Sequence, residues 1–230
     1  MQLFCFPYAG GSVPAFRSWG ERLPDIEVWI AHLPGRGSRI REDAFTRMLP
    51  LVQALTRCLP QTSGRPQPFA FFGHSLGARL GFEVARTLRR QNRPLPVQLL
   101  ISACPAPQVP PENPSIHAWP KAAFLAELQR RSGLPTEVTS VQELLDLLLP
   151  MLRADFAVFE TAVYQREAPL DCSISVFGGH DDPVVSQEAL LAWEEQTTGS
   201  FQATILPGDH FFMKTAEAQL LQHIGRLLAP

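Results

Sequence analysis

One stretch in the first half of the chain constrains the fold more than any other. Phe69-Ala70-Phe71-Phe72 is a run of four apolar residues, which indicates a buried strand. Directly after it, Gly73, Ser75 and Gly77 form a G-x-S-x-G pattern. The apolar residues that follow recur at helical spacing, at Leu76, Leu80, Val84 and Leu88. The sequence therefore predicts a strand, a tight turn that carries Ser75, and a helix.

A nucleophile elbow requires this context of strand, turn and helix. In such an elbow the serine occupies a strained turn that projects its hydroxyl above the sheet edge, and the glycines let strand and helix approach closely. The backbone N–H of Leu76 then lies at the helix N-terminus, where the dipole favours a developing oxyanion. The alternative is a chance match in a glycine-bearing turn. A catalytic Ser75 requires an acid and then a histidine further along the chain.

Strands and helices alternate along most of the chain. We expect further buried strands at residues 3–6, 27–33, 97–103, 172–177 and 201–206. Helical spacing predicts helices at residues 46–59, 122–129, 141–164, 186–196 and 216–228. We find no internal repeat and no linker that divides the chain. The alternation predicts a single α/β domain over residues 1–230, with a mostly parallel central sheet flanked by helices.

Residues 105–168 interrupt this alternation. A proline-rich stretch is followed by two helical patterns, and the second contains the run Leu144-Leu145-Asp146-Leu147-Leu148-Leu149. A helix that is apolar on nearly all sides is usually buried in a core. A helical insertion between two strands can instead be a lid that covers the elbow and shapes an acyl pocket. We expect a lid, with plain core packing as the alternative.

The acid and the histidine that Ser75 requires follow the last two strands, at the edge where open α/β sheets place their chemistry. Gly179-His180-Asp181-Asp182-Pro183 follows the strand at 172–177. We favour Asp182 over Asp181 as the acid, because Asp182 falls at the tip of the turn and Pro183 stiffens it. His210 follows the final strand, downstream of the serine and both acids. Ser75, Asp182 and His210 are therefore the predicted catalytic triad. The other histidines fit this scheme less well: we expect His74 to point away from Ser75, and His117 to lie on the surface.

Two loops before the elbow carry further candidates. The glycine pair Gly10-Gly11 follows the first strand and can turn the backbone so that its N–H groups are exposed. It is either the second arm of an oxyanion hole or an ordinary turn. Arg36, Arg39 and Arg41 cluster after the second strand. For them we expect a solvated loop, with contact to a phosphate or a carrier protein as the alternative.

These segments together resemble the type II thioesterases of the α/β-hydrolase superfamily, the stand-alone editing enzymes of nonribosomal peptide and polyketide synthesis. The resemblance spans nearly the whole chain. Its blocks are Phe6-Pro7-Tyr8-Ala9-Gly10-Gly11-Ser12, Leu33-Pro34-Gly35-Arg36 with Arg39, Gly73-His74-Ser75-Leu76-Gly77-Ala78, Pro150-Met151-Leu152-Arg153-Ala154-Asp155, the turn at 179–183 with Trp193, and Gly208-Asp209-His210-Phe211-Phe212. Arg79 departs from the family, which usually has an apolar residue there, and leaves the pocket's size and polarity open.

The resemblance implies the same triad, an oxyanion hole formed by the amides of Ala9 and Leu76, and a mobile lid over an acyl chamber. It also implies a substrate class, namely acyl thioesters on the phosphopantetheine arm of acyl or peptidyl carrier domains, from which stalled or wrongly primed groups are removed. No metal and no cofactor of the enzyme's own is implied. A fatty acyl-carrier thioesterase or a carboxylesterase would use the same triad and stays an alternative. A hydrolase fold used only for binding has no reason to keep all three residues in order.

Composition limits which partners and which cellular location we expect for this chain. A net charge of −2 does not predict a nucleic-acid-binding surface. No apolar run is long enough to span a membrane, and the first residues read as a strand rather than as a signal peptide. The four cysteines are scattered, at Cys5, Cys58, Cys104 and Cys172, which favours reduced thiols. We therefore expect a cytoplasmic protein, and a monomer.

Overall fold

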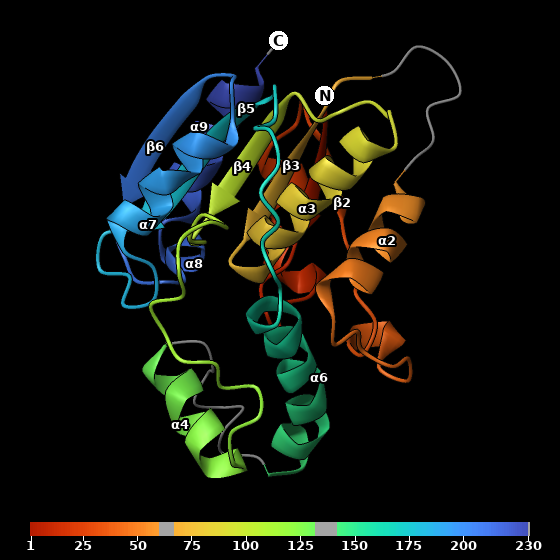
Figure 1. The fold of residues 1–230 in the computed structure, drawn as a ribbon, viewed down its shortest axis with the longest axis vertical. Helices are drawn as coiled ribbons and strands as arrows, with labels where there is room; N and C mark the ends of the chain where they lie inside the picture. The colour runs from red at the N-terminus through yellow and green to blue at the C-terminus, as the bar shows by residue number, and fades with distance from the viewer. Residues whose placement is uncertain (60–66, 132–141, 230) are drawn as a thin grey trace.

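In the part of the chain that the structure describes, the central sheet has six parallel strands. A computed structural model describes residues 1–59, 67–131 and 142–229. Within them the strand order is β2-β1-β3-β4-β5-β6, and all five pairings are parallel, so the predicted α/β class with its mostly parallel sheet is confirmed (Figure 1). The strands are β1 (Gln2–Phe6), β2 (Glu27–Ile30), β3 (Phe69–His74), β4 (Gln98–Ser102), β5 (Ser173–Gly179) and β6 (Phe201–Leu206).

Helices cover both faces of the sheet. One core cluster packs α2 (Met48–Cys58), α3 (Leu76–Arg90) and α7 (Gln187–Leu191) with η3 (Ala192–Gln196) against the sheet. The opposite cluster contains η1 (Val13–Phe16), α1 (Trp19–Arg22), α8 (Phe212–Thr215) and α9 (Glu217–Leu228). Successive side chains of β3 point to opposite faces, as a strand requires: Phe71 belongs to the first cluster and Phe72 to the second. A strand buried on both faces explains the uninterrupted apolar run at 69–72.

The segment 105–168 lies between β4 and β5 and carries α4 (Lys121–Arg130) and α6 (Gln142–Glu160). Both helices lie beyond the carboxyl ends of the strands (Figure 1). They share a small apolar cluster of their own, in which Phe124 and Leu128 of α4 meet Met151 and Leu152 of α6. Only one face of the leucine-rich run is covered, since Leu145 is buried whereas Leu147 is 56% exposed. Residue 141, where we expected this helix to begin, lies outside the described residues.

The parallel arrangement brings distant loops to one edge of the sheet. The segments that follow β1, β3, β5 and β6 all leave from the carboxyl ends of neighbouring or near-neighbouring strands. These segments contain Ala9, Ser75, Asp182 and His210, respectively. The fold thereby places the residues singled out in the sequence on the same edge, beneath α4 and α6.

Candidate active site

The turn at Ser75 joins β3 directly to α3. Ser75 has φ 53° and ψ −116°, a left-handed conformation that costs a non-glycine residue about 1–3 kcal/mol. Its amide donates to the carbonyl of Ser102 at 2.8 Å, which fixes the turn to β4. A Cβ on Gly73 would lie 2.2 Å from the Gly77 backbone, and one on Gly77 would lie 2.0 Å from the Phe6 carbonyl oxygen. The two glycines therefore permit the close approach that lets Ser75 project from the sheet edge.

Asp182 and His210 meet across the ends of β5 and β6. Asp182 Oδ2 lies 2.9 Å from His210 Nδ1, and the two side chains are 2% and 7% exposed. The other oxygen of Asp182, Oδ1, accepts the amides of Val184 at 2.7 Å and Val185 at 3.1 Å. A carboxylate held at Nδ1 leaves Nε2 of the neutral imidazole as the proton acceptor.

Asp181 is placed differently from its neighbour. Its side chain is 72% exposed and contacts His180, at 2.8 Å between Oδ1 and Nδ1. Among the residues that the structure describes, it makes no hydrogen bond or ion pair with His210. Of the two acids left open by the sequence, the structure brings only Asp182 to the histidine.

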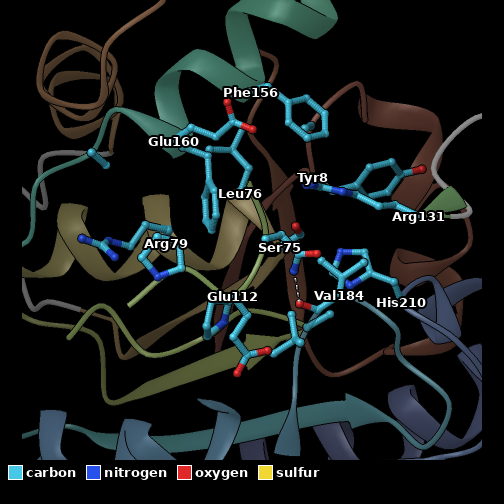
Figure 2. Close-up of a pocket in the computed structure, with 18 of the residues that line it drawn as sticks. Tyr8, Ser75, Leu76, Arg79, Glu112, Arg131, Phe156, Glu160, Val184 and His210 are labelled. Carbon is cyan, nitrogen blue, oxygen red and sulfur yellow. Dashed lines mark hydrogen bonds between the residues drawn. The ribbon is translucent and has the colours of Figure 1, made fainter. Parts of the chain in front are cut away.

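A cavity of about 440 Å³ opens over Ser75 and His210 (Figure 2). Ser75, His210, Ala9 and Leu76 all line it. Its upper wall comes from the insertion and is mostly apolar, with Leu128, Leu152, Phe156 and Phe159. The cavity thus combines a small polar group at the sheet edge with an apolar chamber, as a site for an acyl chain needs.

The loop after β1 supplies backbone donors beside Ser75. The Gly10 amide donates to Asp155 Oδ2 at 2.8 Å, and the Gly11 amide donates to the Tyr8 carbonyl at 2.8 Å. Within the described parts of the chain, the amides of Ala9 and Leu76 donate to no protein group. Both residues line the cavity, so both N–H groups are available to donate to a bound group.

Arg36 is not in a solvated loop, as the sequence had suggested, but is buried at 3% exposure. Its guanidinium forms a bidentate pair with Asp155 of α6, at 2.6 and 2.8 Å, and donates to the Gly11 carbonyl at 2.9 Å. The same carboxylate holds the Gly10 amide. Arg36 and Asp155 therefore join the loop that carries Ala9 to the insertion. Sequence reasoning found no role for Asp155, because its partners lie 119 and 145 residues away.

His74 packs against His210 inside the protein. It is fully buried, its Nδ1 is 2.9 Å from Ser102 Oγ, and its ring centroid is 5.4 Å from that of His210. Burial holds the pKa of His74 well below its usual range, and the nearby His210 and Lys214 lower it further. His74 is therefore neutral at physiological pH, so it adds no charge beneath the triad.

The insertion also contains an unexpected polar centre. Glu160, at the end of α6, accepts the amides of Ile116 and His117 at 2.9 and 3.0 Å and contacts His117 Nδ1 at 2.7 Å. His117 is thus held in place, with a side chain only 29% exposed, rather than lying freely on the surface. These contacts tie the proline-rich segment to α6.

Two kinds of feature are absent from the described residues. In those residues there is no cluster of three or more histidine, cysteine or acidic side chains arranged to hold a metal ion. Likewise, no helix in the described part of the chain has the length and apolar character to cross a membrane. The four cysteines form no disulfide; three are buried and Cys58 is exposed.

Comparison with known proteins agrees with this arrangement. The family model for the thioesterase domain matches residues 1–228. The gramicidin S biosynthesis protein GrsT of Aneurinibacillus migulanus is 38% identical over 229 residues, covering 99% of this chain and 89% of that protein. RedJ, a thioesterase from the prodiginine biosynthetic pathway in Streptomyces coelicolor, has a TM-score of 0.92 at 38% identity, covering 99% of this chain and 90% of RedJ. YbtT, a type II thioesterase from the yersiniabactin NRPS/PKS biosynthetic pathway, has a TM-score of 0.88 at 30% identity, covering 98% and 91% of the respective chains.

Proposed function

The chain belongs to the thioesterase domain family, and from that premise we propose that it is a stand-alone type II thioesterase. It hydrolyses acyl groups from the phosphopantetheine arms of acyl or peptidyl carrier domains and so removes aberrant or stalled groups during nonribosomal peptide or polyketide synthesis. The observation that carries the proposal is the Asp182–His210 pair, which shares one largely apolar cavity with Ser75 on its strained turn.

We assign the chemical roles as follows. His210 Nε2 takes the proton of Ser75 as the serine oxygen attacks the thioester carbonyl, and Asp182 holds the imidazole in the required tautomer. The amides of Ala9 and Leu76 stabilise the oxyanion. The imidazolium then protonates the departing thiolate, and a water molecule activated by His210 hydrolyses the acyl-serine.

The segment 105–168 acts as a lid in this proposal. The end of α6 is anchored, because Val158 belongs to a sheet-face core and Asp155 pairs with Arg36. The movable part is therefore α4 with the first half of α6, which pack on each other in a small cluster of their own. Opening admits the phosphopantetheine arm, and closing excludes water from the chamber. The enzyme needs no cofactor of its own, because the arm arrives with the substrate. We place the enzyme in the cytoplasm, as a monomer.

A serine-directed fluorophosphonate tests the nucleophile. It should label the wild-type protein and fail to label Ser75→Ala, which should also lose turnover while keeping its fold. Ser38→Ala, which removes an exposed serine outside the cavity, is the matched control and should label normally. Labelling that persists in Ser75→Ala would remove Ser75 from this role.

A substrate panel separates the thioesterase from its rivals. One short acyl group is presented on a holo-carrier protein, on coenzyme A, on N-acetylcysteamine and as a p-nitrophenyl ester. We expect the highest kcat/KM for the carrier form. Equal rates on the three thioesters would argue against carrier recognition, and a marked preference for the oxygen ester would favour a carboxylesterase. In a second series, with acyl groups of increasing length on one carrier, rates that rise with chain length would favour a fatty acyl-carrier thioesterase.

A further inference from the structure

Arg79 places a buried cation in the wall of the cavity. It is the fourth residue of α3, about 6 Å along the helix axis from Ser75 at a rise of about 1.5 Å per residue. Its side chain is 9% exposed, and it lines the same cavity as Ser75. In Figure 2 it extends on the opposite side of Ser75 from His210. Arg79 therefore belongs to the part of the cavity away from the Asp182–His210 pair.

The protein does not use all the donors of this guanidinium. Nε donates to Glu83 at 3.2 Å, and the group lies 5.9 Å from the centre of the Tyr164 ring. Glu83 is shared, since Arg86 also donates to it at 3.4 Å. Nη2 of Arg79 is buried and has no protein acceptor among the described residues. Arg79 thus keeps an unpaired Nη2, with its two N–H groups, and a charge that Glu83 neutralises only in part.

Other charged residues of the cavity wall already have partners. Arg131 donates to Glu127 at 2.8 Å, Glu160 accepts the amides described above, and Glu112 accepts the hydroxyl of Ser186 at 2.6 Å. Buried donors in native proteins are rarely left unused, because an unpaired donor costs more than a hydrogen bond returns. The remaining donor at Arg79 therefore fits an acceptor that arrives from outside the chain.

We propose that Arg79 binds an acceptor oxygen, a carboxylate or a carbonyl, at the far end of the acyl group. The enzyme then prefers acyl chains that carry such an oxygen to alkyl chains of the same size. This inference rests on the proposed function, because it assumes that the acyl group is attached to Ser75. The apolar wall formed by Leu128, Leu152 and Phe159 contacts the carbon chain, and Arg79 supplies the selective contact. Discrimination follows because an alkyl chain leaves the buried donor unpaired, whereas an oxygen pairs it.

Three N-acetylcysteamine thioesters of nearly equal size test this specificity: hexanoyl, 5-oxohexanoyl and glutaryl. The second carries a neutral carbonyl and the third a carboxylate at the same carbon. In the wild type we expect kcat/KM for at least one oxygen-bearing chain to exceed that for hexanoyl by about 10-fold or more. A preference for glutaryl alone identifies the carboxylate as the ligand, and a preference for both identifies any acceptor oxygen.

The variant Arg79→Met should abolish this preference by lowering the rates on the oxygen-bearing chains, while hexanoyl hydrolysis continues. Arg79→Lys keeps the charge but not the planar fork, and should retain part of the preference for glutaryl. Arg90→Met is the matched control: it makes the same change on the same helix outside the cavity and should keep the wild-type ratios. Melting curves verify that each variant folds. If Arg79→Met does not fold, the kcat/KM ratios of the wild type and of Arg79→Lys test the inference instead.

The outcomes separate this inference from the proposed function. If the wild type hydrolyses all three thioesters equally and Ser75→Ala hydrolyses none, Arg79 has no role in selection and the proposed function stands. An unchanged preference in folded Arg79→Met also overturns the inference. If the wild type hydrolyses none of the three, nor the carrier-bound form, the proposed function itself fails.

Discussion

The two ends of the cavity treat their buried charged side chains in opposite ways, although the neutral His74 behind the reaction end also has no partner for Nε2 among the described residues. At the reaction end, which comprises Ser75, Asp182, His210 and the loop at Gly10, both oxygens of Asp182 are engaged by the protein. The distal wall, which comprises Arg79 and Tyr164, leaves Nη2 of Arg79 without a protein acceptor in the described structure.

This difference shows which part of the site is complete before a substrate arrives. Groups that stabilise a transition state must be held in advance, since reorganising them during the reaction would raise the barrier. A group that selects a substrate needs the opposite property, namely a partner that only the correct substrate supplies. The reaction end has the first property and the distal wall the second.

The largest effect is expected at Asp182. Asp182→Asn removes the charge that fixes the His210 tautomer, and the equivalent change in a serine protease lowers kcat about 10⁴-fold. Asp181→Asn is the matched control and should leave kcat nearly unchanged, because Asp181 is exposed and pairs only with His180. Steady-state kinetics on one thioester measures both. If Asp181→Asn causes the larger loss of kcat, Asp182 is not the acid that acts with His210.

The second effect concerns the Arg36–Asp155 pair, which forms the junction between the reaction end and the insertion. Asp155→Ala leaves Arg36 buried without its charge partner, which should lower the free energy of unfolding by about 3–5 kcal/mol. It should also lower kcat, because the Gly10 amide loses its acceptor and the loop that carries Ala9 loosens. Urea unfolding and kinetics measure the two effects. Asp146→Ala, an exposed change on the same helix, should alter neither. Equal stability of Asp155→Ala and wild type would show that the junction does not hold the loop.

These two acids also show how far the sequence could be read. The alternation of apolar runs and helical spacing predicts the strands and helices well, because burial imposes those periods locally. Asp182 was predictable from its place after a strand. Asp155 was not, because its role depends on partners on distant segments, and no local pattern reveals a buried ion pair. For the same reason Arg36 was expected in solvent. The segments that carry Arg36 and Asp155 meet because of the way the strands are arranged in the sheet. That arrangement cannot be read from local patterns in a single sequence.

A smaller effect is expected at His74, which underlies the reaction end. Its pKa is lowered in the folded protein, whereas in the unfolded chain it titrates near 6.5. Below about pH 6.5 the unfolded chain therefore binds a proton that the folded protein does not. Stability should fall with decreasing pH, by up to about 1.4 kcal/mol per unit from this group, and should be unaffected by it at higher pH.

Urea unfolding at pH 7.5, 6.5 and 5.5 measures this contribution. Carboxylates and other histidines add their own pH dependence, so the test is the difference between the wild type and His74→Gln. The variant should lose less stability than the wild type between pH 6.5 and 5.5. Parallel curves would mean that His74 takes up its proton in the folded protein as readily as in the unfolded chain, contrary to the lowered pKa.

The smallest effect is expected at the distal wall, and it sharpens the comparison most. Arg79→Met replaces a poorly paired buried cation with an apolar side chain of similar length, and Glu83 keeps Arg86 as a partner. Replacing a buried charge by a well-packed apolar group is often neutral or stabilising, so the free energy of unfolding should change by less than about 1 kcal/mol. Asp155→Ala, measured in the same urea series, provides the contrast, because it leaves a buried charge without its partner and Arg79→Met does not. A loss at Arg79 as large as the loss at Asp155 would mean that Arg79 supports the fold, and the two ends of the cavity would then not differ. A neutral result would leave substrate selection as the role of the Arg79 guanidinium.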